Sequence, residues 1–332
     1  MNPADLLLAT LRPGGATGAE QLRDAWSRAD VRGLGRLIEF EGSALWTYRR
    51  LRQLDVLPAL DAGFVAWLSD EGRGATARNL LVDAEVVAVA RALDRLGIPG
   101  VFMKGAARRL VADRYPMADA RRTNDVDILV PDRRAGDLWH ELRRQGYTRT
   151  NPAKPPRPEH HHLPALMSDR RVGVEIHTTH ARGIDPGVSW RRHFLNSASV
   201  VRDGVTFRVP SATELFWTAT AHALLIPDLA FFLVRLLDTA LVWASGAAID
   251  WDEVARRLDA KEIVDGGAAA AWLDAARQLA GQELPAALAE RVTSYDLSRA
   301  LRLRLAVLRR VPVPGGWRKA LAWWTSEVAR GR

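Results

Sequence analysis

Two aspartates separated by one residue stand at the start of a short apolar run in the middle of the chain. Asp125 and Asp127 are followed by Ile128, Leu129 and Val130, a pattern that predicts a buried strand. Residues i and i+2 of a strand share a face, with Cα atoms roughly 6.5–7 Å apart. Two ionised carboxylates on an apolar strand repel each other unless a cation lies between them. The pattern therefore predicts a site for a hard divalent cation such as Mg²⁺ or Mn²⁺.

A third carboxylate lies further along the chain, in a second apolar segment. Glu175 stands between Val174 and Ile176, which predicts another strand. If the two strands are neighbours, three carboxylates meet, and such a set can hold two ions about 3.5–4 Å apart, the separation used for in-line phosphoryl displacement. The alternative interpretation of Asp125 and Asp127 is a pair of solvated acids at a strand end.

The residues before these carboxylates favour phosphate binding. The sequence predicts a short strand over Val101–Met103 and a helix over about 106–115, whose N-terminus would point toward phosphate. Gly105 allows the backbone to approach an anion closely. Lys104 and Arg121 would place positive charge on a triphosphate or on departing pyrophosphate. For Arg121, a salt bridge to one of the carboxylates is the alternative, because buried acids usually have a partner.

The order of these residues resembles that of a known family. Lys104-Gly105, then Arg121-x-x-x-Asp125-x-Asp127, then Glu175-x-His177 is similar to the nucleotidyltransferases of the DNA polymerase β fold. It is closest to the bacterial branch usually labelled uncharacterised nucleotidyltransferase, and the resemblance covers most of the chain. It implies an α/β (α+β) fold, in which a nucleotidyltransferase core with a small mixed sheet is flanked by N- and C-terminal helical regions.

The resemblance also implies roles for particular residues and a reaction. The catalytic, metal-binding carboxylates would be Asp125, Asp127 and Glu175, and the nucleotide-binding residues would be Lys104, Gly105, Arg121 and His177. Gly105-Ala106 replaces the usual Gly-Gly or Gly-Ser of the wider superfamily, so a hydroxyl that usually contacts phosphate is missing. The reaction would move NMP from an NTP, such as ATP, to an acceptor hydroxyl on a protein, peptide, RNA or small molecule, with release of pyrophosphate.

Histidines near the third carboxylate raise other possibilities. His177 shares the strand face of Glu175, so it could contact nucleotide or acceptor, orient Glu175, or be an incidental polar neighbour. A zinc hydrolase site built on His160–His162 is less favourable, since consecutive side chains of an extended chain point to opposite faces. A fold retained as a non-catalytic binding or regulatory module is a further alternative, although such a module has no need for three clustered acids.

Composition describes an ordinary globular protein with an excess of positive charge. The 332 residues are 48% hydrophobic and 26% charged, and the absence of cysteine excludes disulfides and thiolate zinc sites. The formal charge of +8 is compatible with an anionic partner, but the favoured interpretation is arginines scattered through the helices that reflect genome composition. With no basic segment at the N-terminus and no uninterrupted apolar run of about 20 residues, we expect a cytoplasmic protein without a membrane partner.

Hydrophobic patterns predict three regions: a helical region over 1–95, the core over 96–210 and a second helical region over 211–332. The individual elements expected are helices over 6–11, 34–45, 80–96 and 133–145, a hairpin formed by 163–167 and 172–178, and a buried helical pair within 219–248. Asn151–Pro158 predicts a proline-rich loop beside the proposed site. The basic, tryptophan-containing tail over 299–324 could contact nucleic acid or a membrane surface, but an amphipathic helix with a solvated basic face is the favoured interpretation.

Overall fold

The computed structural model describes residues 3–12, 18–111, 117, 119–151, 161–181, 183–225, 232–260, 262 and 266–294. The chain forms two compact units: Thr76–Thr218 is one, and Met1–Ala75 with Ala219–Arg332 is the other. Apart from Asn151, the predicted proline-rich loop lies outside the described residues, as does the basic tail. The expected core region over 96–210 falls within the first of these units, and the three-region division itself stays a prediction.

The unit that contains both chain ends is helical in its described parts. Its elements are α1 (Pro3–Leu11), α2 (Ala19–Ser27), α3 (Val31–Glu41), α4 (Ala44–Gln53), η1 (Leu57–Ala59), the start of α5 (Ala62–Leu96), the end of α9 (Ala212–Leu225), α10 (Phe232–Ala244), α11 (Trp251–Asp259), α12 (Gly266–Ala280) and α13 (Ala286–Ser294). The buried pair expected within 219–248 corresponds to α9 and α10. None of the described helices combines the length and the apolar character that crossing a bilayer requires.

The prediction of one helix over 34–45 is wrong, because a glycine divides the segment. Gly42 has φ +60° and follows α3, and its N–H donates to the carbonyl of Glu39. A left-handed residue at this position ends a helix, and glycine adopts it without steric cost. The helix expected over 80–96 is instead the last part of the 35-residue α5.

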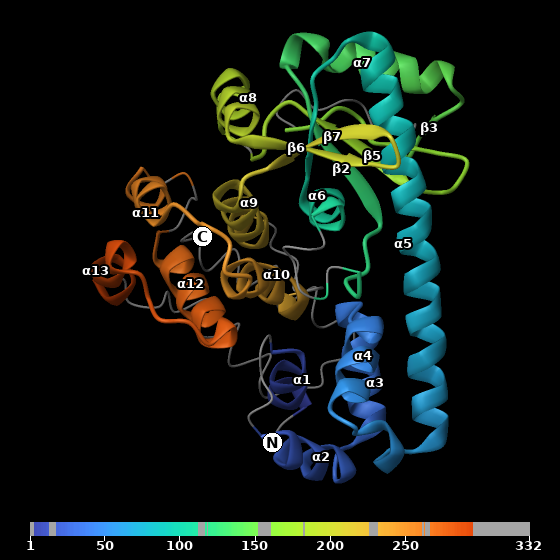
Figure 1. The fold of residues 1–332 in the computed structure, drawn as a ribbon, viewed down its shortest axis with the longest axis vertical. Helices are drawn as coiled ribbons and strands as arrows, with labels where there is room; N and C mark the ends of the chain where they lie inside the picture. Colours follow the sequence, from blue (N-terminus) through green and yellow to red (C-terminus); the bar gives the residue numbers. More distant parts are fainter. Residues whose placement is uncertain are drawn as a thin grey trace. The chain divides into compact units, whose positions relative to one another are not determined.

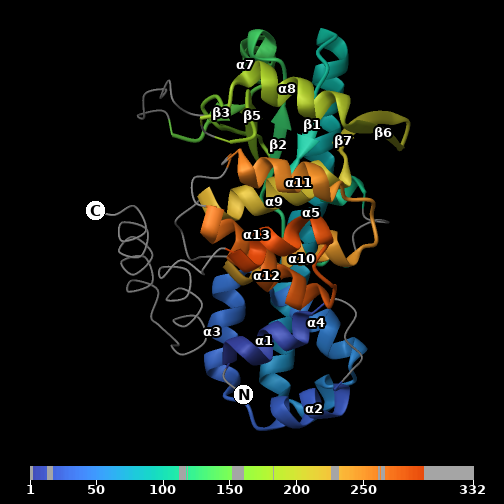
Figure 2. The ribbon, with the colours of Figure 1, turned by 90° about the vertical axis from the view of Figure 1, so that its left-hand side faces the viewer.

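The second unit is built on a five-stranded mixed sheet (Figures 1 and 2). Its strands lie in the order β1-β2-β5-β4-β3, and β2 pairs with β5 in parallel whereas the other pairs are antiparallel. The strands are β1 (Val101–Met103), β2 (Asp125–Leu129), β3 (Thr148–Arg149), β4 (Leu166–Met167) and β5 (Gly173–His177). The predicted strands around Asp125 and Glu175 and the predicted hairpin are therefore confirmed.

Helices and a second hairpin surround this sheet. They are the later part of α5, α6 (Lys104–Leu110), α7 (Asp132–Arg144), α8 (Pro186–Leu195), and a hairpin of β6 (Ser197–Arg202) and β7 (Val205–Pro210). The hairpin packs beside β1, as Figure 2 shows, at the opposite end of the sheet from β3. No sequence pattern predicted this hairpin separately from the core.

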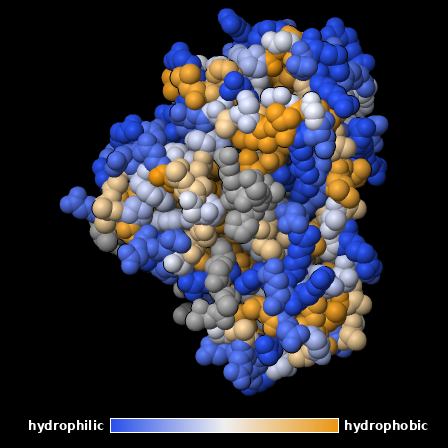
Figure 3. Space-filling view, viewed as in Figure 1, coloured by the Kyte–Doolittle hydropathy of each residue, from blue (hydrophilic) through white to orange (hydrophobic). Residues whose placement is uncertain are grey.

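Helix α7 confirms the prediction of a helix over 133–145. Its buried residues Ala135, Leu138 and Leu142 recur at helical spacing and pack in the core of the sheet. The outer surface of this helix is mostly hydrophilic (Figure 3). Gly146, with φ +94°, follows the helix and lets the chain turn back into β3.

The two faces of the central strands have different partners. Alternate residues of β2 and β5 are apolar, fully buried, and packed with the inner face of α5; they are Val126, Ile128, Val174 and Ile176. Because side chains of a strand alternate between its faces, the intervening polar residues share the opposite face. This arrangement leaves one face to stabilise the unit and the other for chemistry.

Candidate active site

The register of the central parallel pair brings the predicted carboxylates together. Asp127 pairs with Glu175, and Asp125 pairs with Gly173, one side-chain repeat earlier. All three acids therefore lie on the same face of neighbouring strands, as the sequence predicted for β2. His177, which pairs with Leu129, follows Glu175 on this face.

Asp127 lies at the centre of the cluster and is held by two donors. Its Oδ1 accepts hydrogen bonds from Lys104 Nζ at 2.6 Å and His177 Nε2 at 2.8 Å. Burial alone would raise the pKa of the Asp127 carboxyl, but the charge on Lys104 and the bond from His177 bring this pKa far below its ordinary value. Asp127 is therefore an ionised carboxylate that is almost completely buried.

Lys104 is the cation that balances Asp127. Burial alone would lower its pKa, but the carboxylates of Asp127, Glu175 and Asp125 raise it above the ordinary value, so the ammonium stays charged. Lys104 also has φ +48°, a left-handed conformation that is uncommon for a residue with a long side chain. The surrounding packing therefore fixes where its side chain leaves the backbone.

The helix expected over about 106–115 differs in its bounds. It begins at Lys104 and ends at Leu110, and positions 112–116 lie outside the described residues. The lysine thus belongs to the first turn of α6 rather than to a loop before it. Lys104 follows Met103, the last residue of β1, and Met103 pairs with Asp127 of β2 in the antiparallel register. The lysine therefore lies next to Asp127.

Glu175 and His177 complete a compact group of potential metal ligands. One ligand atom each from Asp127, Glu175 and His177 lies within 4.8 Å of the others, and His177 Nε2 is 3.4 Å from Glu175 Oε2. Burial would raise the pKa of Glu175, but hydrogen bonding from His177 and the charge on Lys104 lower it. His177 is completely buried, and among the described residues its Nδ1 has no hydrogen-bond partner.

Asp125 lies outside this group of three but responds to the same charges. Burial, followed by the charges on Asp127 and Glu175, raises the pKa of Asp125 to about 6, and Lys104 and Arg121 only partly oppose this. A raised pKa means that an additional negative charge is unfavourable here. Burial is the larger cause and the two neighbouring carboxylates add to it, so a divalent ion bound here would relieve their repulsion.

Gly105 is required by close packing. A Cβ at this position would lie 2.6 Å from Thr123 Cγ2, so the backbone of α6 touches the segment that leads into β2. Only glycine permits this approach without displacement. Contact between Gly105 and a nucleotide stays a prediction.

Arg121 lies half-buried just before β2. Its guanidinium donates to the carbonyl of Arg122, and its charge is one of the influences that lower the pKa of Asp125. Both the nucleotide contact and the alternative ion pair for Arg121 stay predictions.

Two residues of α5 position the site, and no sequence pattern indicated their role. The first, Asn79, is buried; its Nδ2 donates to the carbonyls of Asp119 and Arg121, and its Oδ1 accepts from the N–H of Thr123. A buried asparagine inside a helix is unfavourable unless its amide is bonded elsewhere, which is the one signal that could have identified it.

The neighbouring Arg78 connects both carboxylate strands. Its guanidinium donates to the carbonyl of Asn124 at 2.5 Å, immediately before β2, and to that of Arg171 at 2.8 Å, shortly before β5. One helix therefore holds the entrances of the two strands that carry the acids.

We expect Asn79→Ala to lower the free energy of unfolding by about 1–3 kcal/mol, because the carbonyls of Asp119 and Arg121 lose their donor and the N–H of Thr123 loses its acceptor. Asn79→Asp keeps the acceptor for Thr123 N–H but turns a buried carboxylate toward two carbonyl oxygens, so it should be at least as destabilising. Denaturant unfolding monitored by circular dichroism measures both. Equal stability of wild type and Asn79→Ala would contradict the positioning role.

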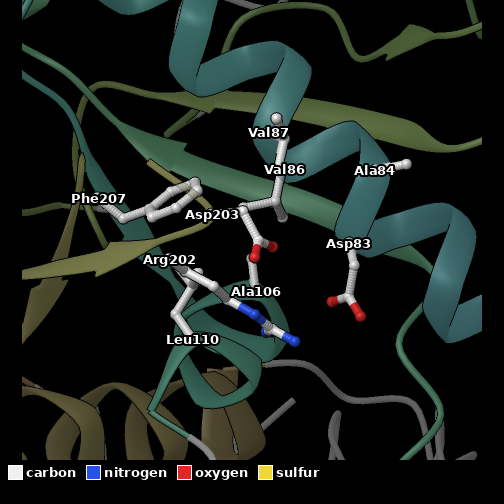
Figure 4. A pocket seen from close by; sticks show the side chains of 9 residues that line it. All are labelled: Asp83, Ala84, Val86, Val87, Ala106, Leu110, Arg202, Asp203 and Phe207. Atoms are coloured by element: carbon white, nitrogen blue, oxygen red, sulfur yellow. The ribbon is translucent and has the colours of Figure 1, made fainter. Parts of the chain in front are cut away.

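A separate pocket of about 190 Å³ lies among α5, α6 and the β6–β7 hairpin (Figure 4). Apolar side chains such as Val86, Leu110 and Phe207 line it, and Arg202 and Asp203 come from the end of the hairpin. None of its lining residues is a predicted site residue. The pocket is therefore distinct from the carboxylate cluster.

Comparison with known families bears on what this cluster does. Residues 27–277 match the model of a family described as uncharacterised nucleotidyltransferase. The chain belongs to this nucleotidyltransferase family. The match includes every predicted site residue, and it confirms the family and the fold class expected from the sequence. No curated protein matches the chain.

Membership gives this nucleotidyltransferase a general role in nucleotidyl transfer, with a nucleoside triphosphate as the implied substrate. The group of Asp127, Glu175 and His177, of which Asp127 and His177 are buried and Glu175 is partly exposed, offers a place for a metal ion.

Proposed function

We propose that the protein is a metal-dependent nucleotidyltransferase that moves NMP from an NTP, such as ATP, to an acceptor hydroxyl. The observation that carries this proposal is the gathering of Asp125, Asp127 and Glu175 on one face of neighbouring parallel strands, where the charges on Asp127 and Glu175 both oppose ionisation of Asp125. Three carboxylates this close together repel one another unless a cation lies among them.

The donor set fits a divalent cation such as Mg²⁺ or Mn²⁺. Carboxylate oxygens from Asp125, Asp127 and Glu175 would hold it, and the N–H of His177 fixes Asp127 in place. When bound, the cation would neutralise phosphate charge and lower the pKa of the acceptor hydroxyl.

The remaining residues act on the nucleotide. Lys104 and Arg121 would bind the triphosphate and the departing pyrophosphate by charge. The acceptor oxygen forms a bond to the α-phosphorus, while the bond from that phosphorus to the oxygen bridging to the β-phosphorus breaks. Pyrophosphate leaves with the bonding electrons, and the hydroxyl proton passes to solvent.

Transfer of label from a nucleotide tests this proposal. Purified protein is incubated with each NTP labelled at the α-phosphate, Mg²⁺ or Mn²⁺, and bacterial lysate, with the Asp125→Ala/Asp127→Ala double variant as the matched control. We expect label on a lysate component only with the wild-type protein.

Two results separate the proposal from its alternative. No label with any nucleotide, combined with no Mg²⁺-dependent NTP binding by equilibrium dialysis, would favour a non-catalytic binding module. Label that also appears with the double variant would remove the carboxylate cluster from the reaction.

A further inference from the structure

A second histidine approaches the carboxylate cluster from the segment before β4. His162 forms an antiparallel bridge with His177, and the N–H of Leu163 donates to the carbonyl of Ile176. This pairing continues the sheet beyond β4 along β5. It places the ring of His162 beside that of His177, with centroids 5.3 Å apart.

The hydrogen bond of one ring nitrogen fixes the form of the other. His162 Nδ1 lies 2.6 Å from the carbonyl oxygen of Leu163, which can only accept, so Nδ1 carries a hydrogen. In the neutral ring, Nε2 then presents a lone pair. Neutral imidazole with one nitrogen bonded to a backbone carbonyl is the usual arrangement of a histidine that binds a metal.

The position of Nε2 matches that role. His162 Nε2 is 4.0 Å from Glu175 Oε2, and this side chain of Glu175 is only partly buried. Two metal–ligand bonds of about 2.0–2.2 Å each, one to nitrogen and one to oxygen, span a separation of this size. A lone pair and a carboxylate at this separation would be stabilised by a cation bound between them.

We propose that His162 is a nitrogen ligand, through Nε2, that makes the carboxylate site prefer Mn²⁺ to Mg²⁺. The inference rests on the proposed function, because it concerns the cation held by the same acids. Mg²⁺ strongly favours oxygen ligands, whereas later divalent ions accept imidazole more readily. A set that mixes imidazole with Asp127 and Glu175 therefore selects an ion that accepts both kinds of ligand.

Isothermal titration calorimetry with Mn²⁺ and with Mg²⁺, in the absence of nucleotide, tests the proposal. We expect wild type to bind Mn²⁺ at least about tenfold more tightly than Mg²⁺. His162→Asn keeps a donor for the Leu163 carbonyl but has no counterpart of Nε2, and it should weaken Mn²⁺ binding about tenfold or more. Its effect on Mg²⁺ binding should be less than about threefold. His140→Asn, at an exposed position of α7, is the matched control.

Pulsed electron paramagnetic resonance of bound Mn²⁺ supplies a second readout. Nitrogen modulation from a coordinated imidazole should be strong in wild type and weaker in His162→Asn. If His162→Asn fails to fold by circular dichroism, His162→Ala, which offers no ligand atom, replaces it in both measurements.

The outcomes separate this inference from the proposed function. Equal loss of Mn²⁺ and Mg²⁺ affinity, or no loss of either, in a folded His162 variant would overturn the ligand role. Wild-type protein that binds neither ion with or without NTP would count against the proposed function itself.

Discussion

Replacing Asp127 by asparagine is expected to reduce nucleotidyl transfer by about a thousandfold, with the fold retained. Asp127 is almost completely buried and accepts bonds from both Lys104 and His177. The amide keeps the shape of the side chain but removes the charge that would hold a cation, so the loss should appear in the chemical step and in cation affinity together.

The initial rate of label transfer to the acceptor component, at saturating Mg²⁺, measures this effect. Asp94→Asn is the matched control, because Asp94 is an exposed aspartate of α5 in the same unit. The control should transfer at the wild-type rate. A folded Asp127→Asn protein that retains more than a tenth of the wild-type rate would exclude Asp127 from the reaction.

Replacing Lys104 by methionine is expected to destabilise the metal-free protein by about 3–5 kcal/mol. Methionine has a similar length but no charge, so Asp127 would keep only His177 as a donor while remaining buried. Added Mg²⁺ should then restore stability, because a cation can take the place of the ammonium beside Asp127. We also expect Mg²⁺ to bind more tightly to this variant than to wild type, since Lys104 no longer competes for the carboxylate.

Denaturant unfolding with and without Mg²⁺, together with calorimetric titration, measures these quantities. Lys104→Arg keeps the charge and should be closer to wild type. The double variant Lys104→Met/Asp127→Asn removes both charges. Its loss in free energy of unfolding should be smaller than the sum of the losses of the two single variants. A Lys104→Met protein that unfolds at the wild-type denaturant concentration, without any response to Mg²⁺, would contradict the balancing role.

The shared face of the two aspartates could be predicted from the sequence, because it depends only on the local periodicity of a strand. The two-residue repeat places Asp125 and Asp127 on one face from their spacing alone. That Glu175 lies opposite Asp127 depends on the parallel register, which a sequence pattern cannot specify between segments so far apart in the chain. The family resemblance supplied this missing step.

The bonds by which α5 positions the site could not be predicted from the sequence, for a different reason. Arg78 and Asn79 act through backbone carbonyls and N–H groups that lie about 40–90 residues away in the chain. Backbone groups are present at every residue, so no residue type marks the partners of such bonds.

His177 illustrates a third limit. Its position two residues after Glu175 indicated only a shared face, which left open contact with nucleotide or acceptor, orientation of Glu175 and an incidental polar neighbour. The burial of its ring and its bond to Asp127 are tertiary facts, and they favour the orienting role in the metal-free protein.

The anchoring of the site to α5 also constrains how this helix can change its length. Asn79 and the core residues Val82, Val86 and Val89 must face the sheet unit from one helix. Deleting one residue between Asn79 and Val82 would rotate everything before the deletion by about 100° relative to the core. The amide would turn away from Thr123, although every side chain of the site would still be present. Insertions and deletions within this turn of α5 should therefore inactivate the protein as surely as loss of a carboxylate.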